Sequence, residues 1–111
     1  MTVAQERIES IRRNYNDAAD NEPDDLAAAR TPAQVTAIQA NLAKARSIYF
    51  AAIADGLTKN GDDVEEAFAL TVIAEETVKE ARARSAAVPD LLSKLRAATS
   101  AAGKLYQVAS N

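Results

Sequence analysis

Apolar side chains recur every three or four residues along most of the chain, which is the spacing of helices that bury one face. The first such stretch extends from Thr2 to about Ala19 and places Ile8 and Ile11 on one side. Thr2 and Gln5 have the spacing of a capping box, in which two side chains bond to the free N–H groups of the first turn. We therefore predict a helix over this stretch.

The segment TPAQ, residues 31–34, is the strongest helix start in the sequence. Thr31 suits the N-cap, and Pro32 suits the first helical position, where no N–H partner is needed. An apolar stripe then continues for about 27 residues, or roughly 40 Å of helix. We expect a long central helix whose inward residues are Val35, Ile38, Leu42, Ala45, Tyr49, Ala52, Ile53 and Leu57.

Two more helices follow the central one. The first is predicted to begin at Asp62 or Asp63 and to end near Ala87, because Pro89 excludes continuation. Pro89 and Asp90 then begin the last helix. Together these stretches predict an all-α fold, an antiparallel four-helix bundle, in a single domain over residues 1–111. The interruption DNEPDD predicts a short extra helix or crossover between the first and second long helices.

The composition indicates how closely the helices pack and which partners and locations are expected for this bundle. The chain has 26 alanines and no tryptophan, so its helices can approach closely and a large internal cavity is not expected. The net charge of −3, without a long basic run, argues against nucleic acid as a partner. The first ten residues lack the apolar core of a signal peptide, and no apolar run approaches the about 20 residues of a membrane span. We expect a cytoplasmic protein, and the alanine and arginine usage favours a bacterial or phage source.

The segment DGLTKNGDDVEE, residues 55–66, has the length and the acidic ends of a calcium-binding EF-hand loop. However, Leu57 and Lys59 occupy the third and fifth positions, which should carry ligands, and Gly61 comes one position late. The segment is better explained as a turn between helices, with Asn60 and Gly61 as the C-cap. We expect no bound metal ion there.

The residue types restrict the available chemistry, because the chain contains neither histidine nor cysteine. The commonest general base and the best nucleophile are therefore missing, and we expect no cofactor and no catalytic residues. The acidic segment at residues 17–25 is interpreted as a solvated connection rather than a metal site. Arg7, Arg12 and Arg13 alternate with Glu6 and Glu9, which favours a solvated helix face over a phosphate site.

Glu75 is the one carboxylate that falls at the edge of an apolar helix face. A buried acid with a raised pKa would be a functional candidate. An ion pair is the simpler interpretation, with Lys79, Arg46 or Arg82 as the partner. We predict a semi-buried pair that involves Glu75, Arg46 and Arg82.

Leu70, Ile73 and Thr77 form a second apolar strip, on the side of their helix that faces away from the main stripe. Charged residues border the strip, as is typical of helix-docking surfaces. Three interpretations remain open: the segment at residues 20–31 folds over the strip, another protein chain contacts it, or the strip is simply exposed.

Three classes of function fit these features. The favoured one is a non-enzymatic interaction or structural module that forms a homo-oligomer or docks on another protein. The first alternative is a carrier of small apolar ligands or a lipid-surface binder. The second alternative is an enzyme that uses carboxylate and arginine groups at a subunit interface.

Overall fold

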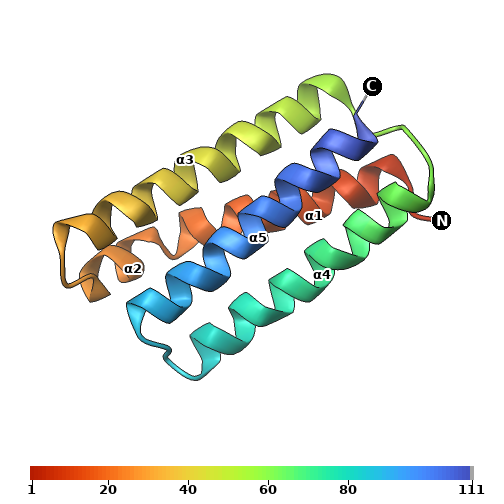
Figure 1. Ribbon diagram of the computed structural model, residues 1–111. Helices are drawn as coiled ribbons and strands as arrows, with labels where there is room; N and C mark the ends of the chain where they lie inside the picture. The colour runs from red at the N-terminus through yellow and green to blue at the C-terminus, as the bar shows by residue number, and fades with distance from the viewer. Residues whose placement is uncertain (111) are drawn as a thin grey trace.

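A computed structural model describes residues 1–110, and all regular structure in that range is helical. The four long helices are α1 (Ala4–Asp20), α3 (Pro32–Asp55), α4 (Asp62–Ala83) and α5 (Val88–Ala109), and the short helix α2 (Glu22–Ala28) follows α1. The long helices alternate in direction, so that α1 and α4 point one way and α3 and α5 the other (Figure 1). The predicted all-α bundle, with a short helix between the first two long ones, is confirmed.

The long helices surround a common core. Neighbouring pairs are α1 with α3, α3 with α5, α5 with α4, and α4 with α1, and α1 also touches α5 across the centre. The bundle measures 42 × 25 × 18 Å, with its long dimension along the helices. At Gly103, an added Cβ would lie 3.4 Å from Cδ1 of Ile48, so α5 and α3 approach closely there.

The N-cap of α3 is the predicted residue, whereas the N-cap of α1 differs from the prediction. Thr31 caps α3, because its side chain accepts a hydrogen bond from the Gln34 N–H at 3.1 Å. In α1 the N-cap is Val3, whose N–H donates to Glu6 at 3.1 Å. The predicted pairing of Thr2 with Gln5 is therefore wrong by one residue, because Thr2 bonds to Glu65 of α4 instead.

The connection between α3 and α4 begins earlier than predicted. Gly56, with φ of 73°, ends α3, so the C-cap is not at Asn60 and Gly61. A positive φ is easily adopted by glycine, which has no Cβ to collide with the backbone. Leu57 thereby leaves the helix and becomes completely buried.

The connection between α4 and α5 also begins earlier than predicted, because α4 ends at Ala83 rather than near Ala87. Ser85 adopts φ of 53°, and the Ala86 N–H donates to the Ala81 carbonyl at 2.9 Å. This is the bonding of a left-handed helix C-cap, which satisfies a carbonyl that the helix leaves free. Val88 then begins α5 directly.

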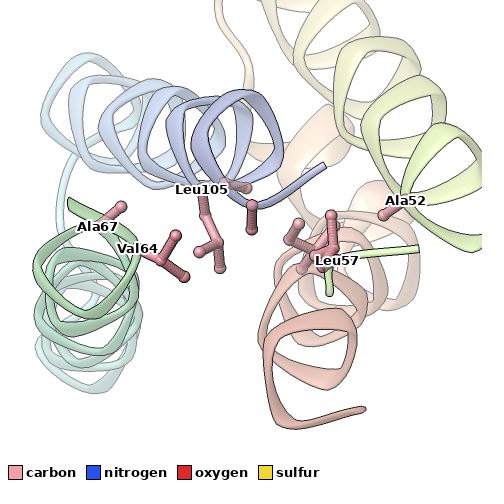
Figure 2. Close-up of a cluster of buried hydrophobic side chains, with 8 residues drawn as sticks. Ala52, Leu57, Val64, Ala67 and Leu105 are labelled. Atoms are coloured by element: carbon pink, nitrogen blue, oxygen red, sulfur yellow. The ribbon is translucent and has the colours of Figure 1, made fainter. Parts of the chain in front are cut away.

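The apolar core has two parts, one at each end of the bundle. Figure 2 shows the part beside the α3–α4 connection, where Val64 and Leu105 point toward one another. The second part lies toward the α4–α5 connection. The first comprises Ile11, Ala52, Leu57, Val64, Ala67, Ala102, Leu105 and Ala109; the second comprises Ile38, Val78, Ala81, Val88, Leu91, Leu92, Leu95 and Ala98.

A polar layer separates the two parts. The hydroxyl groups of Ser10 and Thr71 are 2.6 Å apart, and Asn14 donates to the hydroxyl of Thr99 at 3.2 Å. Along α4, Thr71 lies between the residues of the first part and those of the second. Every buried side-chain nitrogen and oxygen within residues 1–110 has a hydrogen-bond partner, so the layer carries no unpaired polar group.

One residue of the central helix α3, Ile53, does not face the core as predicted. Ile53 is 54% exposed, whereas Ala52 is completely buried. Successive helical residues point about 100° apart, so both cannot face the centre. The smaller residue lies inside, where α3 packs against α1 and α5.

Candidate functional site

The predicted strip on α4 lies on the surface. Leu70 is 50% exposed and Ile73 is 62% exposed, while the Thr77 hydroxyl donates to the Ile73 carbonyl at 2.9 Å. The strip forms one wall of a groove of about 320 Å³. The opposite wall comes from α5 and consists of Lys94, Ala97 and Ala101.

The segment at residues 20–31 does not cover this strip, so that interpretation is wrong. Its helix α2 lies against α1 and α3. The reason is that Leu26 and Ala29 pack against the second core part, while Asp25 bonds to Arg82. These contacts hold the segment at one end of the bundle and leave Leu70 and Ile73 exposed.

Glu75 is paired, but its partner differs from the prediction. Oε1 of Glu75 accepts from Nε of Arg13 at 2.9 Å, across the contact between α4 and α1. Arg46, on α3, instead lies over the Tyr15 ring, 5.8 Å from its centroid. The structure does not bring Glu75 together with Arg46, which lies on α3, or with Arg82, which pairs with Asp17 and Asp25.

Arg82 joins three helices. It donates to Asp17 of α1 at 2.9 Å and to Asp25 of α2 at 2.8 Å. Burial favours the neutral form, but the hydrogen bonds from Arg82 to Asp25 and Asp17 outweigh it and raise the pKa of Arg82. Asp25 is buried, so the acidic segment at residues 17–25 is not simply a solvated connection.

Arg7 was expected on a solvated face and is instead completely buried. Its guanidinium donates to the carbonyls of Thr2, Leu57 and Lys59 at 2.7 to 2.9 Å. It also donates to Asn60 at 3.0 Å and Glu65 at 3.1 Å. All three guanidinium nitrogens are engaged, so Arg7 anchors the α3–α4 connection and has no donor left for a ligand.

A cleft of about 280 Å³ opens between α1 and α4. Its apolar lining comes from Val78, Ala98 and Ala102. Sequence reasoning anticipated no large internal cavity and did not consider an open cleft, which small residues on α5 allow. The polar lining residues are Ser10, Arg13, Asn14, Asn16, Asp17, Thr71, Glu75 and Lys79.

Residues 1–110 contain no group of three or more acidic side chains placed to hold a metal ion. Residues 55–66 form the end of α3, the connection and the first turn of α4. No helix in the same range is long and apolar enough to cross a membrane.

Comparisons with protein-family models, curated proteins and solved structures found no match. Function is therefore inferred from the surfaces of the bundle itself. Among its concave surfaces are the groove between α4 and α5 and the cleft between α1 and α4.

Proposed function

We propose that the protein is a helical interaction module that forms a homodimer through the α4–α5 face. This face comprises Leu70, Ile73 and Thr77 of α4 with Lys94, Ala97 and Ala101 of α5. The observation that carries the proposal is that Leu70 and Ile73 are at least half exposed beside an alanine-lined groove. Large apolar side chains next to a recess are typical of contact surfaces.

The α4–α5 face is complementary to itself in shape. In a two-fold dimer the same patch meets itself, so it must supply both projections and recesses. Leu70 and Ile73 supply the projections, and Ala97 and Ala101 supply the recess. Leu70 of α4 and Ala101 of α5 line the same groove. A second copy that sets its α4 over this α5 therefore places leucine and isoleucine against alanine.

The charges along the two helices support the same pairing. Glu66 and Glu80 lie on the α4 side together with Arg84, whose charge is paired with Asp90, while Lys94 and Lys104 lie on the α5 side. Placing α4 of one copy over α5 of the other brings the acidic border to the basic border. Such complementarity favours the correct partner and register more than it adds affinity.

The α4–α5 face is also large enough for a dimer interface. Each helix has 22 residues, which corresponds to about 33 Å. Two adjacent helices with side chains are roughly 20 Å wide, so the face covers roughly 660 Å². A standard stable interface buries about 800 Å² per partner, so this face supplies most of that area.

The test is the mass in solution of Ile73→Glu, measured by light scattering at high micromolar concentration. We expect the unmodified protein to have twice the chain mass of 11.8 kDa, and Ile73→Glu to be monomeric with an unchanged melting temperature. Ile53→Glu is the matched control, because Ile53 is similarly exposed but lies on α3. A monomeric unmodified protein, or a dimeric Ile73→Glu variant, would contradict the proposal.

A charge exchange tests the pairing of the two borders. Glu66→Lys should weaken the dimer, because lysine would then face Lys104 of the second copy. Adding Lys104→Glu to the same chain should restore dimerisation, since the two charges are then exchanged. No recovery in the double variant would show that these borders do not meet.

A further inference from the structure

The cleft between α1 and α4 lies on a different side of α4 from the proposed dimer face. Its floor is formed by Val78 of α4 with Ala98 and Ala102 of α5, all three of which are buried. Thr71, Glu75 and Lys79 complete the α4 wall, whereas the α4–α5 groove uses Leu70, Ile73 and Thr77. A ligand in the cleft would therefore not compete with a second copy.

Hydrogen bonds and an ion pair define the shape of the cleft. The Ser10 and Thr71 hydroxyl groups, 2.6 Å apart, join its two walls toward one end. The bond from Arg82 to Asp17, at 2.9 Å, joins the walls toward the other end. Between them, Arg13 and Glu75 form the pair at 2.9 Å that spans from α1 to α4.

Two cationic side chains in the cleft, Arg13 and Lys79, retain free hydrogen-bond donors. Arg13 uses only Nε for Glu75, and its two Nη groups have no partner within residues 1–110. Lys79 is exposed, and its Nζ lies 3.6 Å from Oε1 of Glu76. Glu76 itself does not line the cleft. The carboxylates of Glu75 and Asp17 are engaged by Arg13 and Arg82. An incoming anion would therefore find free donors in the cleft. The two carboxylates that could repel it are already paired with arginines.

We propose that this cleft binds a small organic carboxylate with an apolar body. The two Nη groups of Arg13 match the two oxygens of a carboxylate, which is the geometry of the strong bidentate pair. The apolar body would lie against the floor of the cleft, beside Val78, Ala98 and Ala102. Ligand pockets usually have volumes of about 300 to 1,000 Å³, so a cleft of about 280 Å³ suits a body of a single ring or a short branched chain.

Phenylacetate is a suitable probe, because it joins one ring to one carboxylate. We expect saturable changes in the amide NMR signals of Ser10, Thr71 and Ala98 during titration. Phenylacetamide keeps the shape but lacks the charge, so it should bind at least about tenfold more weakly. Equal affinity for acid and amide, or no saturable change in the cleft, would overturn the proposal.

Two neighbouring arginines provide a matched pair of variants. Arg13→Gln should reduce phenylacetate affinity at least about tenfold, because the bidentate donor is lost. Arg12→Gln should leave affinity unchanged, because Arg12 pairs with Glu9 and does not line the cleft. Equal affinities in the two variants would show that Arg13 does not hold the carboxylate.

Filling the cleft tests the position of the apolar body. Ala98→Leu should abolish phenylacetate binding while the circular dichroism stays helical. Undiminished binding in a folded Ala98→Leu variant would contradict the site. Should the added volume unfold the bundle, the comparison of Arg13→Gln with Arg12→Gln decides the question.

Discussion

The buried guanidinium of Arg7 donates through Nη2 to Oε2 of Glu65 at 3.1 Å, and so joins α1 to the first turn of α4. Glu65 also accepts the Thr2 N–H at 2.8 Å and the Thr2 hydroxyl at 2.9 Å. The backbone bond from Thr2 is the main cause that lowers the pKa of Glu65. Partial burial opposes it, while the Thr2 hydroxyl and Arg7 lower this pKa further.

The lowered pKa of Glu65 predicts a loss of stability in acid. A group whose pKa is lower in the folded state stabilises the fold above its unfolded pKa of about 4.3. That contribution is lost as the pH falls through the folded pKa. We expect the free energy of unfolding, measured by urea denaturation, to fall below about pH 4.

Glu65→Gln separates this effect from other carboxylates. Arg84 is the main cause that lowers the pKa of Asp90, so Asp90 contributes to the same acid transition. The variant should be less stable than the unmodified protein at neutral pH and should lose less stability on acidification. Parallel pH profiles for the two proteins would show that Glu65 does not contribute.

Arg7→Met should destabilise the bundle strongly. The change keeps an apolar side chain but removes donors from the Leu57 and Lys59 carbonyls and from Glu65. Leaving a buried group such as the Leu57 carbonyl without its donor costs about 1 to 3 kcal/mol, and several groups lose their donor here. Arg12→Met is the control, because Arg12 is exposed, and it should change stability by less than about 0.5 kcal/mol. Similar denaturation curves for both variants would contradict the anchoring role of Arg7.

Ser85→Gly should stabilise the protein. Ser85 has φ of 53°, and a residue with a Cβ in this conformation costs roughly 1 to 2 kcal/mol relative to its preferred backbone. Part of this gain is offset by the greater freedom of glycine in the unfolded chain. Thermal unfolding should therefore show a higher melting temperature. Ser93→Gly, an exposed position within α5, should lower it by the usual helix penalty.

Leu57→Ala and Ile53→Ala should lower the stability by different amounts, although the sequence predicted that both residues face inward. Leu57 is completely buried, so its truncation should cost about 2 to 5 kcal/mol. Ile53 is 54% exposed and should cost clearly less. Chemical denaturation of the two variants measures the difference, and equal losses would place Ile53 in the core.

The local signals in the sequence predicted the helices well and their ends less well. Thr31 and Pro32 act within one turn, so their effect is visible without knowledge of the fold. The choice of Gly56 over Gly61 for the C-cap of α3 depends on burying Leu57 beneath the helices, which is a tertiary requirement. Helix ends therefore shifted where packing competed with local preference.

The polar partners were harder to predict than the helices. Arg7 lies four residues before Ile11, so its position on the inward face could have been noticed. Its partners are carbonyls of a connection that takes shape only in the folded bundle. For Glu75 the edge position was recognisable, but the choice of Arg13 follows from which helix adjoins α4.

The polar layer of Ser10, Thr71, Asn14 and Thr99 affects how the bundle opens. Apolar contacts join residues within each core part, while the layer between them is held by directional hydrogen bonds. Either half can then open while the other stays intact, as in proteins that unfold locally in separate cooperative units. Native-state hydrogen exchange should therefore resolve two groups of amides with different opening energies, divided within α4 at Thr71 rather than between helices.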